Sequence, residues 1–225
     1  MSIFAISDLH LSLGTDKPME VFGWDNYVER IEANWKRLVK SDDTVVIPGD
    51  ISWALKLEEA LEDFKFIESL PGNKLILKGN HDLWWSTAKK VYEFFEKNSI
   101  NSVELVFNRA VVAENRAICG SRGWLFGGGD DDKKIIAREC GRLERSLTAA
   151  KETGYKPLVF MHYPPAYGDD VIPEFIDILK RFDVEAVYYG HIHGQGFNNA
   201  IPEFDGIKLK LLSADCINFV PFLIK

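Results

Sequence analysis

The five histidines of this 225-residue chain all lie in short motifs made of metal-binding residue types. Together with one further carboxylate motif, they are Asp8-Leu9-His10, Pro48-Gly49-Asp50, Gly79-Asn80-His81-Asp82, Met161-His162-Tyr163-Pro164-Pro165 and Gly190-His191-Ile192-His193. In a generic soluble domain, histidines are divided between the surface and the core. Here no histidine is left for an ordinary role, which predicts one composite site built from loops along nearly the whole chain.

Side chains in these motifs offer carboxylate oxygens, an amide oxygen and imidazole nitrogens, and none of them is a cysteine. The candidate metal ligands are Asp8, His10, Asp50, Asn80, His162, His191 and His193. This mixed set suits Mn, Fe, Co, Ni or Zn better than Ca, and Mg is less suited. The set is too large for one ion and fits two ions that share a carboxylate. Paired ions can clamp an in-line displacement at phosphorus and supply hydroxide at neutral pH.

Apolar runs that are typical of buried strands recur along the chain, and five of them come directly before these motifs. The expected strands are Ile3–Ile6, Thr44–Ile47, Lys74–Leu77, Ala110–Ala113, Ala117–Cys119, Leu158–Met161, Ala186–Tyr189, Lys208–Leu212 and Phe219–Ile224. Open α/β sheets bind ligands outside the carboxyl ends of their strands, so motifs at five strand ends can converge on one crevice. Gly49, Gly79 and Gly190 precede the ligands. They are expected to allow the tight or left-handed turns that point side chains inward, although for any one glycine alone an ordinary strand-end turn is the better explanation.

Helical stripes alternate with several of the strands, which favours an α/β domain with a more β-rich second part and therefore a second sheet. The stripes are Val28–Leu38, Leu57–Ile67, a helix from a Ser86 cap to about Lys97, Ile136–Ala150, and a helix that begins at Pro173. The chain is long enough for one large domain, residues 1–225.

The net charge of −7 and the pI of about 5.3 make non-specific nucleic-acid binding less expected. The three cysteines have no CxxC spacing, which favours a reducing compartment over a disulfide framework. Neither a signal peptide nor a run of 18 apolar residues is present, so a cytoplasmic protein without a membrane span is expected.

The ordered set Asp-x-His, Gly-Asp, Gly-Asn-His-Asp, His and Gly-His-x-His resembles the calcineurin-like metallophosphoesterase superfamily from Asp8 to His193. The resemblance implies a four-layer α/β/β/α sandwich of two mixed β-sheets flanked by helices. It implies that one metal is bound by Asp8, His10, Asp50 and His193, and the other by Asp50, Asn80, His162 and His191.

The same resemblance implies a catalytic role for two further residues. His81 looks like the histidine that contacts the phosphate and protonates the leaving oxygen after attack by a metal-bridging hydroxide. Asp82 looks like its orienting partner, and a helix N-cap is the alternative for that carboxylate. The implied function is hydrolysis of a phosphodiester or phosphomonoester, with a nucleotide-like small molecule as one candidate substrate.

Two other functions stay open at this point: a nuclease with the same centre, and a non-catalytic protein-binding scaffold. A Ser/Thr protein phosphatase is disfavoured, since Ile51-Ser52-Trp53 replaces the arginine-containing motif of those enzymes. The oligomeric state is left open.

Several residues near the motifs have two interpretations each. The aromatic residues Trp53, Trp84, Trp85, Tyr163 and Tyr167 could stack on a planar substrate group, although packing of the sheet–helix interface is the more frequent use of such rings. Arg122 could bind phosphate through two hydrogen bonds or form an ordinary salt bridge. Residues 13–23 and 127–132 are candidate lids, and the second segment is otherwise a surface loop with acidic residues at a helix N-terminus.

Overall fold

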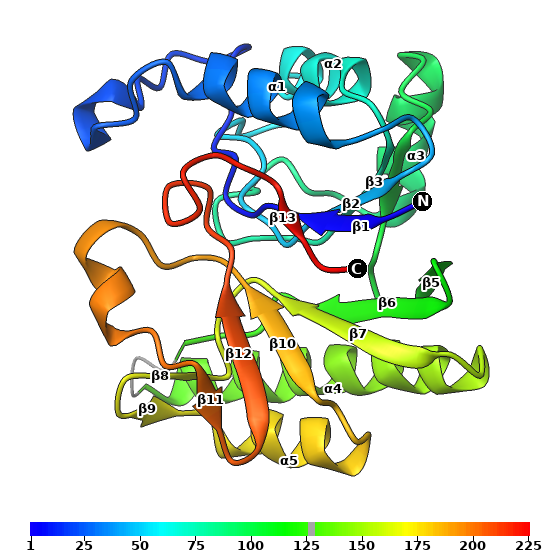
Figure 1. The fold of residues 1–225 in the computed structure, drawn as a ribbon, viewed down its shortest axis with the longest axis vertical. Coiled ribbons are helices and arrows are strands. Elements are labelled where there is room, and N and C mark those ends of the chain that lie inside the picture. The colour runs from blue at the N-terminus through cyan, green and yellow to red at the C-terminus, as the bar shows by residue number, and fades with distance from the viewer. Residues whose placement is uncertain (126–128) are drawn as a thin grey trace.

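In residues 1–125 and 129–225, which the structure describes, the chain folds into two large mixed β-sheets packed face to face (Figure 1). Helices cover both outer faces, so that from top to bottom of Figure 1 the layers are helix, sheet, sheet and helix. This computed structural model therefore confirms the α/β/β/α sandwich that the resemblance implied.

The first sheet carries the N-terminal ligand motifs at its strand ends. Its strands are β1 (Ile3–Ala5), β2 (Thr44–Ile47), β3 (Asn73–Ile76), β4 (Val103–Leu105) and β13 (Phe222–Leu223). Their order is β13-β1-β2-β3-β4, with β1 to β4 parallel and β13 antiparallel to β1 at one edge. The parallel strands are joined by helical crossovers, because parallel neighbours cannot be linked by a tight turn.

These crossovers cover the outer face of the first sheet. They are α1 (Tyr27–Leu38), α2 (Leu61–Ser69) and α3 (Ala88–Lys97), and a short 3-10 helix, η1 (Glu20–Phe22), precedes α1. The stripe predicted in α1 faces the core, with Ile31 and Trp35 fully buried. The expected starts of the next two helices were wrong by a few residues. Leu57 lies before α2, and Thr87 rather than Ser86 caps α3 by accepting from the backbone N–H of Lys90.

The second sheet is the β-rich later part that the sequence predicted. Its strands are β5 (Val111–Ala113), β6 (Arg116–Ser121), β7 (Lys156–Met161), β10 (Ala186–Tyr189), β11 (Glu203–Phe204) and β12 (Ile207–Leu211). Their order is β11-β12-β10-β7-β6-β5, and the antiparallel strands β11 and β5 lie at the two edges. The parallel strands β6, β7, β10 and β12 form its centre.

Helices α4 (Asp130–Glu152) and α5 (Pro173–Arg181) cover the outer face of the second sheet. The acidic residues Asp130, Asp131 and Asp132 form the first turn of α4, where the helix dipole favours negative charge. A small hairpin, β8 (Ala166–Tyr167) and β9 (Asp170–Val171), and a 3-10 helix, η2 (Gly194–Asn199), complete the fold.

The alternation of strand side chains divides the apolar core into layers. In β1, Ile3 and Ala5 pack between the two sheets, whereas Phe4 packs under the outer helices. In β7, Phe160 packs between the sheets and Val159 under α4 and α5. Both faces of the central strands are thus buried, which explains why these strands read as continuous apolar runs.

The sequence missed β4, β8, β9 and β11, because they are strands of two or three residues without a continuous apolar run. It also overestimated the last strand, since Phe219 has a left-handed φ of 60° and Pro221 has no N–H for a ladder. Among the described residues, no helix is long and apolar enough to cross a membrane.

Candidate active site

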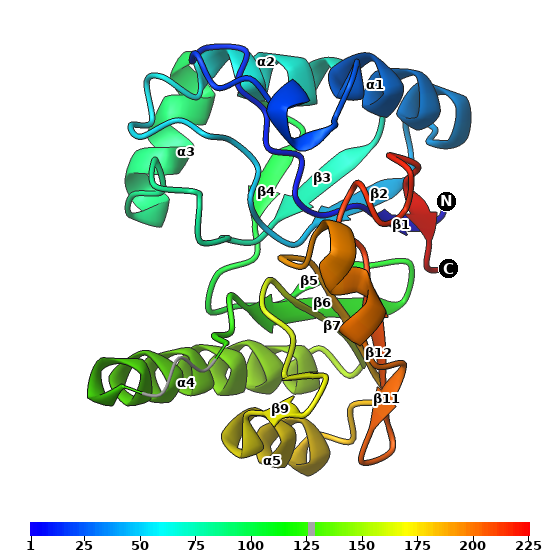
Figure 2. The same cartoon turned by 90° about the vertical axis from the view of Figure 1, so that its left-hand side faces the viewer.

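Each chemical motif lies in a loop that follows a parallel strand. The motifs of Asp8, Asp50 and Asn80 follow β1, β2 and β3, and those of His162 and His191 follow β7 and β10. Parallel strands end at the same edge of their sheet, and the two sheets pack face to face. The loops therefore meet on one side of the sandwich, the side that faces the viewer in Figure 2.

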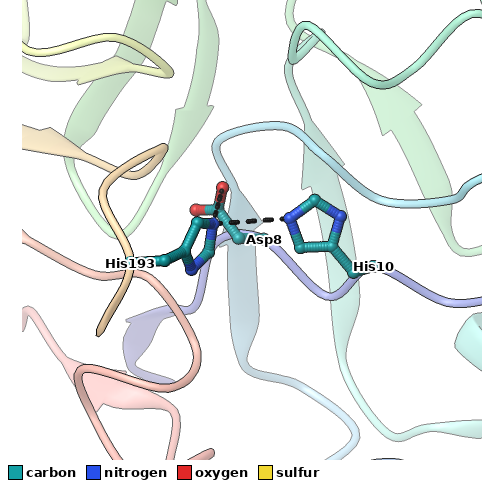
Figure 3. Close-up of side chains that lie close together, drawn as sticks. All are labelled: Asp8, His10 and His193. Carbon is teal, nitrogen blue, oxygen red and sulfur yellow. Dashed lines mark hydrogen bonds and ion pairs between the residues drawn. The ribbon is translucent and has the colours of Figure 1, made fainter. Parts of the chain in front are cut away.

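Asp8, His10 and His193 form the first ligand group, with one ligand atom of each within 4.8 Å of the others. Nε2 of His193 lies 3.3 Å from Oδ1 of Asp8 and 3.4 Å from Nε2 of His10. Figure 3 shows the three side chains directed toward one another, with these contacts as dashed lines. His193 follows a strand of the second sheet, whereas Asp8 and His10 follow β1 of the first. The group thus joins the two sheets at their common edge.

Asp50, His162 and His191 form the second ligand group, again with ligand atoms within 4.8 Å of one another. Nε2 of His162 lies 3.4 Å from Oδ2 of Asp50. The amide oxygen of Asn80 completes the group, lying 2.7 Å from Nε2 of His162 and 2.9 Å from Nδ1 of His191. All seven predicted ligand side chains are therefore close together, although only the structure divides them by contact into two groups.

Asp50 lies between the two groups. Its Oδ2 is 3.4 Å from Nε2 of His162 in the second group and 3.7 Å from Nε2 of His10 in the first. Its Oδ1 accepts a hydrogen bond of 2.8 Å from the backbone N–H of His81. One carboxylate oxygen is thus placed where a ligand shared by two ions would lie.

The loops reach this arrangement through unusual backbone conformations. Asp8, His10, Asp50 and His191 all have left-handed φ values, from 46° to 71°. Such conformations are uncommon for residues other than glycine, and they occur preferentially at functional sites. The fold therefore bears a local conformational cost to point these side chains toward one another.

The glycines beside the ligands serve this geometry in two ways. Gly49 has a φ of 112°, in agreement with the expected left-handed turn. Gly79 and Gly190 do not have positive φ values, so that reason was wrong for them. Glycine is required there by space, because a Cβ at Gly79 would lie 2.1 Å from Oδ1 of Asp50, and one at Gly190 would lie 2.1 Å from Oδ2 of Asp8.

The electrostatics prepare the site for cations. Burial opposes the ionisation of Asp8, but the hydrogen bond from His193 and the charges of nearby histidines hold its pKa well below the ordinary value. Asp50 likewise has a lowered pKa, because the charge and hydrogen bond of His162 outweigh its burial. Burial lowers the pKa of His10 to about 4, which leaves its imidazole neutral and able to donate a lone pair.

His81 lies over the first ligand group. Its ring centroid is 5.5 Å from that of His10 and 4.3 Å from that of Trp53. Trp53 in turn stacks on His10 at 4.7 Å with an interplanar angle of 22°. The pKa of His81 is lowered by burial, against the opposing charges of Asp50 and Asp8. Aromatic contacts thus hold the His81 ring in place. Because His81 is only half-buried, the ring remains accessible from solvent.

The resemblance implied that Asp82 orients His81, and the contacts of Asp82 in this structure lie elsewhere. Its buried carboxylate accepts hydrogen bonds from the backbone N–H groups of Gly79, Asp50 and Ile51 and from the indole of Trp84, at 2.7 to 3.0 Å. Within the described residues, no hydrogen bond joins it to the His81 ring. It is no helix cap either, since α3 begins only at Ala88. Asp82 instead fixes the Asp50 loop against the Asn80 loop.

Asp215 is the site residue that sequence reasoning missed. Its Oδ1 lies 2.9 Å from Nδ1 of His193, and its Oδ2 accepts from the backbone N–H of Gly194. The hydrogen bonds of His193 with Asp215 and Asp8 and the charges of these two carboxylates outweigh burial and raise the pKa of His193 to about 10. A carboxylate on Nδ1 leaves Nε2 free to face the first ligand group. Asp215 lies outside every recognisable motif, and no sequence signal marked it.

The other candidate residues take different positions. Trp84 is buried and packs edge-on against Phe64, as the packing interpretation expected, and Trp85 is half-buried. The ring of Tyr163 lies 4.0 Å from that of His191, at the site. Tyr167 instead donates to the backbone of Gly196 in η2.

The two candidate lids are the segments 13–23 and 127–132. The first is attached at two points: the N–H of Leu13 donates to Asp63, and Sδ of Met19 accepts from the Trp53 indole. In the second, Gly127 and Gly128 lie outside the described residues, and Asp130 already begins α4.

The donor atoms fit a pair of metal ions. The carbonyl oxygen of Asn80 faces two imidazole nitrogens, and the Nε2 atoms of His10 and His193 face each other. Nδ1 of His162 lies 3.2 Å from the carbonyl oxygen of Pro48. With a metal bound, an N–H at Nδ1 would donate to this carbonyl and the lone pair of Nε2 would be directed inward. Ligand atoms that converge in this way can bind cations, and a mixed N/O set suits first-row transition metals or zinc.

A family model described as calcineurin-like phosphoesterase matches residues 1–195. The chain belongs to the calcineurin-like phosphoesterase family. It is thus a metal-dependent phosphohydrolase, and the two ligand groups are its candidate metal-binding sites. No curated protein matches the chain significantly.

Solved structures with the same fold support this assignment at the level of architecture. A protein of unknown function from Aquifex aeolicus, AQ665, aligns with a TM-score of 0.52 at 14% identity, covering 99% of this calcineurin-like chain and 95% of the other. The phosphopantetheinyl hydrolase PptH from Mycobacterium tuberculosis aligns with a TM-score of 0.50 at 17% identity, covering 94% and 88%. TT1561 of Thermus thermophilus gives 0.52 at 12% identity, covering 85% and 81%.

Proposed function

We propose that this calcineurin-like protein is a dinuclear-metal phosphoesterase that hydrolyses a small-molecule phosphodiester or phosphomonoester. The observation that carries the proposal is the position of Asp50, whose Oδ2 lies within 3.7 Å of a histidine nitrogen from each ligand group. Asp8, His10 and His193 would hold one ion and Asn80, His162 and His191 the other, with Asp50 between them.

Two bound ions would supply a nucleophilic hydroxide at neutral pH and neutralise the charge of the phosphate. The protein contributes the placement of the remaining groups. His81, half-buried above the first ligand group, is assigned to hold the proton that passes to the leaving oxygen. Asp82 is a positioning residue, since it binds the N–H groups of Asp50 and Gly79 and so fixes the two loops that carry Asp50, Asn80 and His81.

A small phosphate ester is supported as the substrate by the composition and by one fold relative. The net charge of −7 disfavours a polynucleotide, which would be repelled outside the metal centre. The Mycobacterium tuberculosis relative is described as a phosphopantetheinyl hydrolase, so the fold is used for a hydrolase elsewhere. Metal identity is proposed from the donor set alone, as Mn, Fe, Zn, Ni or Co.

The experiment is hydrolysis of bis-p-nitrophenyl phosphate and of p-nitrophenyl phosphate after chelation, with Mn²⁺, Ni²⁺, Zn²⁺ or Mg²⁺ restored one at a time. We expect metal-dependent turnover that falls at least about a hundredfold in Asn80→Ala, because one ion loses a ligand. Faster turnover of the diester would define a phosphodiesterase. Bound metal without turnover of either ester would contradict the proposal for these substrate classes.

A further inference from the structure

We infer that Lys78, Arg122 and Arg142 form a second anion-binding subsite beside the metal-ligand loops, which takes a second phosphoryl group of the substrate. The inference rests on the proposed phosphoesterase function, because it specifies what else the substrate carries. The three cations line one small cavity together with Phe107 and Glu139, between the end of β3, the end of β6 and helix α4.

The subsite is part of the same loops as the metal ligands. Lys78 precedes Asn80 by two residues, so their Cα atoms are at most about 7 Å apart. The carbonyl oxygen of Arg122 accepts hydrogen bonds from the backbone N–H groups of His162, at 3.2 Å, and Tyr163, at 2.8 Å. The cavity lining is thus joined to the loops of the second ligand group by sequence and by backbone hydrogen bonds, and we place a neighbouring group of a substrate bound there at the cavity mouth.

Positive charge is in excess here. The carboxylate of Glu139 is fully buried, and its Oε1 lies 2.6 Å from Arg142 and 3.6 Å from both Arg122 and Arg138. In residues 1–125 and 129–225, Glu139 is the one carboxylate that forms ion pairs with these arginines, and Lys78 forms none. The arginines thus outnumber the carboxylate that pairs with them, and the half-buried Lys78 adds a further positive charge to the cavity lining.

Hydrogen-bonding capacity is also unused. The side chain of Arg122 is only 14% exposed. Its Nε is buried and has no hydrogen-bond partner within the described residues. Oε2 of Glu139 is equally without a partner there. The cavity, about 10 Å³ in volume, has room for about one water between such groups. The phosphoryl group would therefore lie at the mouth, where Lys78 and Arg142 are half-buried.

Aromatic rings hold the two guanidinium groups in place. The guanidinium carbon of Arg142 lies 5.1 Å from the ring centroid of Phe107, and that of Arg122 lies 4.8 Å from that of Trp124. A guanidinium held on a ring loses less freedom when it binds an anion, and its planar fork matches a phosphate. The cluster is therefore preorganised for a phosphoryl group.

The test compares two chromogenic esters that differ in one group: p-nitrophenyl thymidine 5′-phosphate with and without a 3′-phosphate. We expect the wild type to prefer the ester with the second phosphate, and Lys78→Gln to reduce that preference about tenfold. Arg142→Lys keeps the charge but loses the fork, so its preference should be intermediate. Lys151→Gln, an exposed residue at the end of the same helix, is the charge-matched control and should leave the preference unchanged.

Binding to the chelated protein separates this inference from the proposed function. Calorimetry would compare thymidine 3′,5′-bisphosphate with thymidine 5′-phosphate, for the wild type and for Lys78→Gln. Tighter binding of the bisphosphate that Lys78→Gln abolishes would support the subsite even if neither ester is hydrolysed. Equal effects of Lys78→Gln and Lys151→Gln, or no preference for the second phosphate in either assay, would overturn the subsite and leave the phosphoesterase proposal standing.

Discussion

The two ligand groups of this calcineurin-like protein are held in place by different means. Around the second group, His162 is fully buried, and the buried carboxylate of Asp82 ties the Asp50 loop to the Asn80 loop through backbone hydrogen bonds. Around the first group, His10 is packed between Trp53 and Trp24, and the side chain of His193 is 32% exposed.

Two sites built from similar ligands can therefore differ in rigidity. Hydrogen bonds to a buried charge fix a loop strongly, because breaking them leaves polar groups unsatisfied in a medium of low dielectric constant. Aromatic contacts contribute less and are less directional. We therefore expect the second group to depend mainly on the contacts of Asp82. The first group should depend on Asp215 and on the hydrogen bonds that buried Asp8 accepts from the backbone N–H of His191 and the hydroxyl of Ser213.

The largest effect is expected from His162→Ala. Its ring contacts both Asp50 and Asn80, so its loss would remove a proposed ligand and open a cavity at a fully buried position. Turnover of bis-p-nitrophenyl phosphate should fall by at least about a thousandfold, and metal analysis of the purified variant should give fewer ions per chain than for the wild type. Unchanged metal content with substantial turnover would show that the second group is not the more demanding one.

The next effect is expected from Asp82→Asn, measured as the free energy of unfolding of the chelated protein in urea. An amide NH₂ would face backbone N–H donors where the carboxylate accepts, so we expect a loss of about 3 kcal/mol. Asp205→Asn is the matched control, since Asp205 forms an exposed ion pair with Lys180 and should cost under about 1 kcal/mol. Similar losses for the two variants would remove the contrast between the groups.

A smaller effect is expected from Asp215→Ala, because Asp215 acts through His193. Loss of the hydrogen bond to Nδ1 should weaken one of two metal-binding events about 10- to 100-fold, as measured by calorimetric titration of the chelated protein. Asp215→Asn retains an acceptor for Nδ1–H and should recover part of the affinity. If both binding events weaken equally in Asp215→Ala, the residue does not belong to the first group alone.

The smallest effect is expected from Trp53→Leu. The indole stacks on His10 and contacts His81, and aromatic pairs of this kind contribute about 1 kcal/mol, so turnover should fall about fivefold. Trp53→Phe keeps a ring and should be closer to the wild type in steady-state kinetics. A loss as large as that of His162→Ala would mean that packing fixes the first group as firmly as hydrogen bonds fix the second.

Much of the fold could be predicted, because its central strands are continuous apolar runs and its helices carry apolar stripes. The prediction failed where the apolar run is short or interrupted. Examples are β4, whose middle residue is Glu104, and the segment that begins at Phe219. In these places the pairing depends on neighbouring strands that local sequence does not identify.

The inventory of the site follows from the sequence alone: which side chains carry ligand atoms, and that each follows a strand whose carboxyl end faces a common edge. The resemblance also implied how these side chains divide between two metals, but their actual contacts required the folded chain, because the contact of His193 with Asp8 joins two sheets across 185 residues of chain. Folding also places Asp82 on backbone N–H groups rather than on His81, Asp215 on His193, and Lys78 and Arg122 in one cavity. Such contacts are set by the packing of distant segments, which leaves no periodic or local pattern in the sequence.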